Sequence, residues 1–185
     1  MSPVKAALNG ITVLALEQAV AIPFATRQLA DLGARVIKVE RPGEGDFARH
    51  YDTRVKGLSS YVAWLNRSKE SIALDLKTEG AQAIVRQLAA SVDVVVQNLA
   101  PGATERLGLS SAELREINPR LITVDLTGYG EGGPLQDRKA YDLLIQAEAG
   151  LLSVTGSASE MVRAGISVAD IAGGMYAYSS VLAAL

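Results

Sequence analysis

The chain has 185 residues, of which 49% are hydrophobic and 21% are charged, and its formal net charge at pH 7 is −2. This length and composition predict one globular domain with its own hydrophobic core. The absence of cysteine excludes disulfides and thiolate metal sites, the single histidine, His50, argues against a histidine-based zinc site, and the small net charge provides no general attraction to nucleic acid.

The first part of the chain predicts a β-α-β unit. Residues 11–16 form a short apolar run that is typical of a buried strand. Residues 23–32 have helical spacing and are followed by Gly33, a common residue just beyond a helix end, and residues 35–40 alternate as a second strand. Such a unit, with short joints, is expected to cross over right-handed onto a parallel sheet.

The same alternation continues after a polar loop over residues 41–57. Further strands are predicted at 71–74, 92–96 and 121–126, and further helices at 78–90 and about 141–152. Residues 107–117 are expected to hold a short helix with Ser110 or Ser111 as its N-cap and Glu113 in its first turn. The pattern predicts an α/β fold, a Rossmann-like open parallel sheet with flanking helices, in which ligands bind at the carboxyl ends of the strands.

The apolar stretch from residue 164 to residue 185 raises the question of a membrane span. It carries one carboxylate, paired glycines and several Ser and Tyr residues, so a buried helix is favoured over a span. Polar residues near the start, such as Asn9 and Glu17, argue against a signal peptide, and a soluble, cytoplasmic protein is expected. The chain stops at Leu185 inside a predicted helix without a cap, which suggests that it is incomplete.

The phosphate-binding motifs of common nucleotide folds are missing. The first predicted strand-helix turn, residues 17–23, lacks Gly-x-Gly-x-x-Gly, and the chain has no P-loop motif, so a dinucleotide on that turn is disfavoured. Basic residues instead recur near predicted strand ends, where they suit phosphate groups: Lys38, Arg41, Lys69, Lys77, Arg106 and Lys139. Taken singly, each is more often a solvated surface cation.

Asp170 is the only formally charged side chain from Ala164 to Leu185. A carboxylate among small and apolar residues is costly to bury unless it is hydrogen-bonded or paired. Two interpretations follow, a satisfied structural acid and a reactive carboxylate, and the residues alone leave both open. Asp142, at another predicted helix start, needs no role beyond favouring the helix dipole.

Seven ordered stretches together resemble the class III CoA-transferase family, also called the CaiB/BaiF family: residues 29–46, 65–77, 97–108, 118–122, 128–134, 141–142 and 168–174. The resemblance covers nearly the whole chain. It implies an acyl-CoA enzyme whose residues 1–185 form the N-terminal part of a Rossmann-like CoA-binding domain, with the small second domain and C-terminal return of the family apparently absent. It also implies an interlocked homodimer.

Roles for individual residues follow from the same resemblance. The acid that matches Asp170 is the nucleophile of the transferases, which form an aspartyl-acyl anhydride and then an aspartyl-CoA thioester. CoA contacts are expected from Ala19, Arg41, Leu74, Lys77, Asn98, Leu99, Ala103, Arg106 and Lys139. The acyl end would be lined by Gln18, Tyr61 and Asp142. CoA or acyl-CoA is then a substrate together with a carboxylic acid acceptor, and no metal and no tightly bound cofactor is expected.

Two alternatives to a transferase remain. One branch of the family racemises 2-methylacyl-CoA esters through a His/Asp pair, but Tyr141 occupies the position of that histidine here, and tyrosine is a poorer base near neutral pH. The other alternative is a truncated, non-catalytic chain that at most binds CoA or a partner chain. The acyl donor and the acceptor acid stay open.

Overall fold

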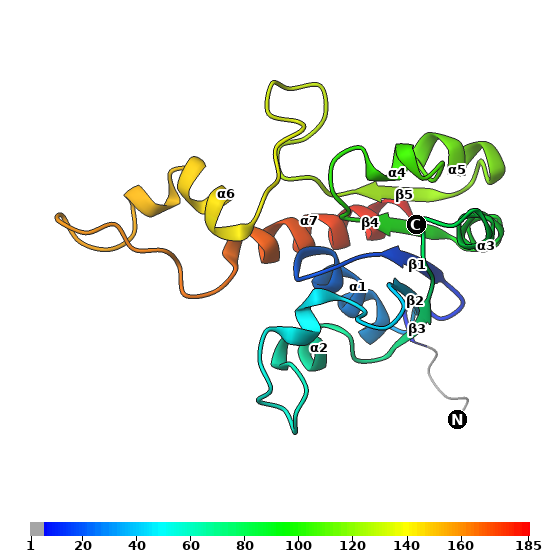
Figure 1. The fold of residues 1–185 in the computed structure, drawn as a ribbon, viewed down its shortest axis with the longest axis horizontal. Coiled ribbons are helices and arrows are strands. Elements are labelled where there is room, and N and C mark those ends of the chain that lie inside the picture. The colour runs from blue at the N-terminus through cyan, green and yellow to red at the C-terminus, as the bar shows by residue number, and fades with distance from the viewer. Residues whose placement is uncertain (1–5) are drawn as a thin grey trace.

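A five-stranded parallel sheet forms the centre of the computed structural model, which describes residues 6–185 (Figure 1). The strands are β1 (Thr12–Leu16), β2 (Arg35–Glu40), β3 (Lys69–Ala73), β4 (Val94–Gln97) and β5 (Ile122–Asp125). They lie in the order β3-β2-β1-β4-β5, and every neighbouring pair is parallel. The predicted Rossmann-like sheet is therefore confirmed, and its strand order reverses between β1 and β4, where such sheets bind ligands.

Helices cover both faces of the sheet. The longer ones are α1 (Ala21–Asp31), α3 (Glu79–Ala89), α5 (Ser111–Ile117) and α7 (Val168–Ala184). The connections carry α2 (Ser60–Leu65), α4 (Ala103–Arg106), α6 (Asp142–Glu148) and two 3₁₀ turns, η1 (Phe47–His50) and η2 (Leu151–Ser153). Sequence patterns did not predict α2 or η1, which lie in or beside the polar loop, and the helix expected to reach residue 152 ends at Glu148.

Two hydrophobic layers pack on the sheet because successive side chains of a strand point to opposite faces. In β1, Val13 and Ala15 pack towards α1 and α7. Leu14 and Leu16 pack instead towards the layer that includes α3 and α5. A strand buried on both faces must be apolar throughout, which is why its sequence is a continuous apolar run.

The last helix, α7, is not the buried helix that its composition predicted. Of its residues only Gly174, Ala177 and Val181 are buried, and Tyr176 is 76% exposed. Within residues 6–185, none of the helices combines the length and the apolar composition that crossing a bilayer requires. The expectation that α7 is buried was wrong, because an evenly apolar helix gives no periodicity from which a buried face can be identified.

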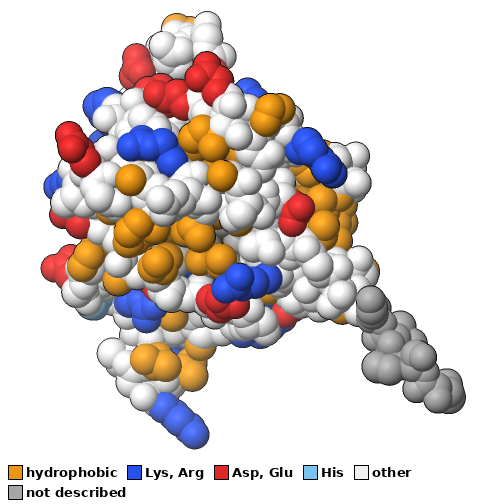
Figure 2. Space-filling view, turned by 90° about the vertical axis from the view of Figure 1, so that its right-hand side faces the viewer, with side chains coloured by type: hydrophobic (Ala, Val, Ile, Leu, Met, Phe, Trp, Pro, Cys, Tyr) orange, Lys and Arg blue, Asp and Glu red, His pale blue; other side chains and the backbone are white. Residues whose placement is uncertain are grey.

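An arm of the chain, residues 141–166, projects away from the sheet (Figure 1). It includes α6 and η2, and it exposes large apolar side chains such as Val154 and Met161. Apolar surface is not confined to the arm, since Figure 2 shows another side of the molecule where hydrophobic side chains gather in the middle and charged ones lie around them. Such patches commonly mark interaction surfaces.

Close packing of α7 on α1 makes a first prediction. A Cβ atom on Gly174 would lie 2.4 Å from the backbone oxygen of Ala21, which cannot move without shifting the start of α1. We expect Gly174→Ala to lower the free energy of unfolding by roughly 1–3 kcal/mol, although alanine favours helix by about 1 kcal/mol. Urea unfolding measures this change.

The matched control is Gly173→Ala. Its Cβ would approach a side-chain carbon of Leu126 at 3.5 Å, which is ordinary contact, so this variant should be as stable as the wild type or more stable. Equal stability of the two variants would contradict the close approach of α1 and α7.

Candidate functional site

A cavity of about 370 Å³ opens at the carboxyl ends of β1 and β2, beside the point where the strand order reverses. Apolar side chains, including Leu74, Leu76 and Leu107, form part of its lining. Arg41, Lys77 and Arg106 also line the cavity, and all three side chains are exposed. An apolar surface edged by cations suits a ligand with a flat ring system and anionic groups.

The structure brings together most of the residues expected to contact CoA. The members that line this cavity are Arg41, Leu74, Lys77, Leu99, Ala103 and Arg106. Gln18, expected at the acyl end, also lines it. Ala19, Asn98 and Lys139 do not, and Lys139 lies exposed at the end of the glycine-rich loop.

Asn98 and Asp46 hold the turn that joins β1 to α1. The Asn98 side chain accepts a hydrogen bond from the Gln18 N–H at 2.9 Å and donates one to the Gln18 carbonyl at 2.9 Å. Ala19 has a left-handed backbone (φ 62°), and its N–H donates to Asp46 Oδ1 at 3.1 Å. The Asn98 amide is thus occupied by the backbone of Gln18.

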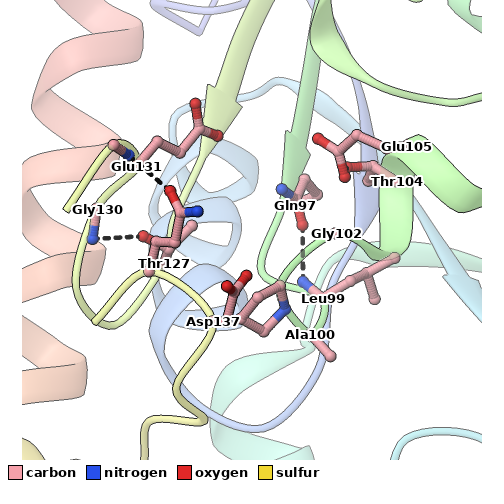
Figure 3. Close-up of a pocket in the computed structure, with 13 residues that line it drawn as sticks. Gln97, Leu99, Ala100, Gly102, Thr104, Glu105, Thr127, Gly130, Glu131 and Asp137 are labelled. Atoms are coloured by element: carbon pink, nitrogen blue, oxygen red, sulfur yellow. Dashed lines mark hydrogen bonds between the residues drawn. The ribbon is translucent and has the colours of Figure 1, made fainter. Parts of the chain in front are cut away.

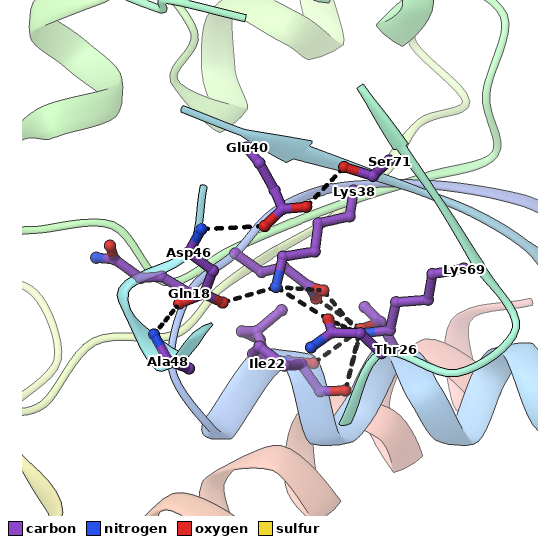
Figure 4. A network of polar contacts seen from close by, with 12 residues as sticks. Gln18, Ile22, Thr26, Lys38, Glu40, Asp46, Ala48, Lys69 and Ser71 are labelled. Atoms are coloured by element: carbon purple, nitrogen blue, oxygen red, sulfur yellow. Dashed lines mark hydrogen bonds and ion pairs between the residues drawn. The ribbon is translucent and has the colours of Figure 1, made fainter. Parts of the chain in front are cut away.

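A buried ionic network lies beside this turn (Figure 4). Lys69 Nζ lies 2.7 Å from Glu17 Oε1, and the two side chains are 2% and 0% exposed. Lys38 Nζ lies 2.7 Å from Asp46 Oδ2 and 3.7 Å from Glu17 Oε1. Thr26 Oγ1 donates to Glu17 Oε2 at 2.6 Å. Burial lowers the pKa of Lys69 to about 8, and the attraction of Glu17 opposes that shift.

This network corrects the interpretation of Lys38 and Lys69 as phosphate ligands. Both ammonium groups point into the protein, where carboxylates and the Asn66 side-chain oxygen accept their hydrogen bonds. Sequence reasoning placed the lysines at strand ends but missed Glu17 and Asp46 as their partners. The available signal was Lys38 itself, a charged residue between the apolar Ile37 and Val39.

Glu40 extends the network to the loop after β2. Its carboxylate accepts hydrogen bonds from Arg49, at 2.9 and 2.7 Å, from the Ser71 hydroxyl at 2.6 Å and from the Asp46 N–H at 3.0 Å. Burial opposes ionisation of Glu40, but these hydrogen bonds outweigh it and lower its pKa to about 2. The loop that carries Arg41 is therefore held at both ends.

Asp170 lies in the first turn of α7 and is partly buried. Burial, and to a lesser degree the neighbouring charge of Asp142, raises the pKa of Asp170 to about 6. It does not line the cavity described above. Ile171, the next residue, packs with Tyr61 and Ala19 around Val20, Phe24 and Leu65, which links the start of α7 to the turn after β1.

Asp142, expected at the acyl end, uses both carboxylate oxygens within the protein. Oδ1 accepts a hydrogen bond from the Ala169 N–H at 2.9 Å, and Oδ2 accepts one from Gln146 Nε2 at 2.6 Å. Asp142 therefore caps the N-terminus of α7, next to Asp170. It also follows the predicted pattern of an acid in the first turn of its own helix, α6.

Aromatic side chains pack beside these residues. Tyr61 contacts Tyr51 and Trp64 edge to face, with ring centroids 5.2 and 6.2 Å apart. Burial, followed by the charges of Asp46 and Asp170, raises the pKa of Tyr51 to about 12. Tyr51 was not predicted as a site residue, and no spacing in the sequence indicates that it lies near Asp170.

A second cavity, of about 380 Å³, lies between the turn after β4 and the glycine-rich loop (Figure 3). Gln97 Oε1 accepts a hydrogen bond from the Leu99 N–H at 2.7 Å, and Thr127 Oγ1 accepts one from the Gly130 N–H at 2.8 Å. Acidic side chains line it, namely Glu105, Glu131 and Asp137. Of the residues that the structure describes, no Lys or Arg lines this second cavity to offset them. The first cavity also has acidic lining residues, but Glu17, Glu40 and Asp46 are paired with Lys69, Arg49 and Lys38, and three cations line it, which makes it the better candidate for phosphate groups.

Metal ligands are not grouped in the part of the chain that the structure describes, residues 6–185. No three His, Cys, Asp or Glu side chains lie there so that they could hold an ion.

Comparison with known proteins gives one consistent result. The model of CoA-transferase family III matches residues 8–185. The chain is 42% identical to human succinyl-CoA:glutarate CoA-transferase and 40% identical to acetyl-CoA:oxalate CoA-transferase of Acetobacter aceti, covering 96% and 98% of this chain but 41% and 47% of those proteins. It therefore spans less than half the length of these relatives.

The solved structures agree. The crystal structure of a CaiB/BaiF family protein from Brucella suis matches with a TM-score of 0.91 at 37% identity, over 98% of this chain and 49% of that one. The fold, the ordered motifs and the family match together show that the chain belongs to CoA-transferase family III.

Proposed function

We propose that this chain takes part in the transfer of CoA from an acyl-CoA to a carboxylic acid, with Asp170 as the nucleophile and the cavity at the ends of β1 and β2 as the CoA site. The observation that carries the proposal is Asp170 itself, a partly buried carboxylate with a raised pKa in a chain of CoA-transferase family III. Removal from water makes a carboxylate a better nucleophile, and a pKa of about 6 leaves most of it ionised at pH 7.

The chemistry is a sequence of acyl exchanges. A carboxylate oxygen of Asp170 attacks the thioester carbonyl, the C–S bond breaks, and an aspartyl-acyl anhydride and CoA thiolate form. The thiolate attacks the aspartyl carbonyl, which gives an aspartyl-CoA thioester and releases the donor acid. The acceptor carboxylate then attacks that thioester to form a second anhydride and thiolate. Attack of the thiolate on the acceptor acyl group releases the new acyl-CoA and regenerates Asp170.

CoA would lie across the first cavity in this proposal. Apolar residues such as Leu74 and Leu76 suit the adenine ring, and Arg41, Lys77 and Arg106 suit the phosphates. Lys139, from the exposed loop, would reach the phosphates from outside the cavity. Asn98 would act by holding the turn after β1, and Ala19 as a residue of that turn.

Arg106 provides a test of this placement. We expect Arg106→Ala to weaken CoA binding roughly 5- to 30-fold, because an exposed charge-assisted contact to phosphate contributes about 1–2 kcal/mol. Isothermal titration with CoA measures the affinity. The control is Arg120→Ala, which removes an exposed arginine that does not line the cavity and should bind CoA as the wild type does. Equal affinity of the two variants would contradict the site.

The partners proposed for the protein are an acyl-CoA, a carboxylic acid acceptor and a second copy of the chain. The exposed apolar side chains of the 141–166 arm and of α7 support an interlocked homodimer, which a mass measurement in solution tests. The names of the relatives include glutarate and oxalate, both dicarboxylic acids. We therefore propose a dicarboxylate acceptor.

A screen of acceptor acids with succinyl-CoA and acetyl-CoA as donors tests the reaction. Appearance of a new acyl-CoA, dependent on the acceptor, supports transfer. Deuterium incorporation at the α-carbon of a 2-methylacyl-CoA, without any acceptor, would support racemisation instead. CoA binding without either activity would leave a chain that binds the substrate and does not turn it over.

A further inference from the structure

Gln146 is a buried amide on α6 with hydrogen bonds at both ends. Gln146 as a whole is only 1% exposed. Nε2 donates to Asp142 Oδ2 at 2.6 Å, and Oε1 accepts from the Ala164 N–H at 2.9 Å. A buried amide is costly unless its polar atoms are paired, so these two contacts hold the side chain in one orientation.

The amide joins two segments that are distant in the sequence. Asp142 lies one turn before Gln146 on α6, whereas Ala164 belongs to the irregular segment that precedes α7. A second, longer contact from Nε2 to the Ile166 carbonyl, at 3.5 Å, lies on the same segment. Gln146 thus ties the segment before α7 to α6.

Asp142, which binds Gln146, also binds the start of α7. The N-cap residue of α7, Ser167, makes no capping hydrogen bond with its side chain. Asp142 Oδ1 accepts instead from the Ala169 N–H at 2.9 Å and, at longer range, from the Asp170 N–H at 3.5 Å. The first amides of α7 are therefore satisfied by a side chain from another helix, which substitutes for a local cap.

We propose that Gln146 is a positioning residue, which holds the Asp142 carboxylate against the first turn of α7 and thereby sets the orientation and the charge environment of Asp170. The proposal rests on the proposed function only in so far as Asp170 is the nucleophile. Gln146 itself does not reach the reacting atoms and acts through Asp142.

The ionisable groups near Asp170 decide the sign of the expected effect. They are Asp142 from α6 and Tyr51 after η1, and Tyr141, just before Asp142, interacts with Tyr51. Of these, the Asp142 charge contributes to the raised pKa of Asp170. Without the hydrogen bond from Gln146, the Asp142 carboxylate is no longer held at 2.6 Å from Gln146 Nε2 and can move away from the start of α7. A greater separation weakens the repulsion, so the pKa of Asp170 should fall below about 6 by the part that Asp142 contributes, while burial, the larger cause, remains.

The test compares Gln146→Met, of similar size but without hydrogen bonds, with Gln82→Met. Gln82, on α3, is the matched control. Its Nε2 also donates to a backbone carbonyl, that of Leu76 at 3.0 Å, but it does so away from Asp170. Carbon-13 NMR titration of the Asp170 carboxyl gives its pKa, and hydrogen exchange reports the Ala169 N–H. In Gln146→Met the pKa should fall and exchange of this amide should accelerate at least about tenfold, whereas Gln82→Met should leave both unchanged.

An unchanged pKa of Asp170 in Gln146→Met would overturn the proposal, even if the variant were less stable to urea, because loss of stability alone is what a merely structural role predicts. If Gln146→Met does not fold, the isosteric Asp142→Asn replaces it. Removal of that charge should also lower the pKa of Asp170, and an unchanged value would refute the link. These measurements require no turnover, so they stand apart from a failure of the proposed function. In an assay of CoA transfer, Gln146→Met should lower kcat and leave CoA affinity unchanged.

Discussion

Replacement of Asp170 by asparagine should abolish CoA exchange while CoA affinity stays within about twofold of the wild type. Asparagine keeps the size of the side chain but has no carboxylate to form the anhydride, so we expect the rate to fall by at least about 10³-fold. Acyl-CoA product formation measures exchange, and isothermal titration measures CoA binding. The control is Asp137→Asn, a neutralised exposed aspartate in the glycine-rich loop region. Retained exchange in Asp170→Asn would remove Asp170 as the nucleophile.

The same variant should be more stable than the wild type at neutral pH. The pKa of Asp170 is raised in the folded protein from 3.8 to about 6, so between these values the folded chain holds more protons than the unfolded chain. Stability therefore falls as pH rises through this window, and above it the ionised Asp170 destabilises the fold. After allowance for solvent screening of a partly exposed group, the gain from Asp170→Asn is on the order of 1–2 kcal/mol.

Urea unfolding at about pH 4 and about pH 7.5 measures that gain, which should vanish at the lower pH. The result also separates the two interpretations of Asp170. A reactive carboxylate kept partly out of water destabilises the fold, whereas a satisfied structural acid stabilises it. A loss of stability in Asp170→Asn at neutral pH would therefore favour the structural acid.

Lys69→Met is expected to lower the free energy of unfolding by about 3–5 kcal/mol. The substitution leaves the fully buried Glu17 carboxylate with the Thr26 hydroxyl and with Lys38 Nζ at 3.7 Å, in place of its ion pair at 2.7 Å. Removing the closest counter-charge of a buried carboxylate is among the costliest changes in a folded protein. Urea unfolding near pH 7 measures the change.

Two controls identify its cause. Glu17→Gln combined with Lys69→Met removes both charges and should recover a large part of the loss. Arg35→Met breaks an exposed pair with Glu70, whose side chains are 59% and 57% exposed, and should change stability by less than about 1 kcal/mol. If Lys69→Met proves as mild as Arg35→Met, the buried network does not stabilise the fold.

Much of the fold could be predicted because its signals are local. The apolar run in β1 and the alternation in β2 identify strands from a few consecutive residues, and the capping box between Ser110 and Glu113 marks the start of α5. The short α2 was missed, since its six residues are too few to show a helical period.

The candidate site was predictable only in part. Arg41 and Arg106 were expected beside a ligand and do line the cavity, whereas Lys38 and Lys69 had the same sequence pattern and are buried against carboxylates. A lysine near a strand end can point towards solvent or into the protein, and the choice depends on partners that are distant in the sequence. Glu17 and Lys69, separated by 52 positions, are an example.

The sequence by itself determined the order of strands and helices, the parallel sheet and the family, because these follow from local periodicity and from motifs in a fixed order. The tertiary structure decided which charged side chains are buried, which of them pair, and how their pKa values shift. Asp170 owes its raised pKa to burial and to Asp142, and Asp142 owes its position to Gln146, on a helix that contacts α7 only in the folded chain. Desolvation and charge repulsion act through space, so no pattern of consecutive residues could predict them.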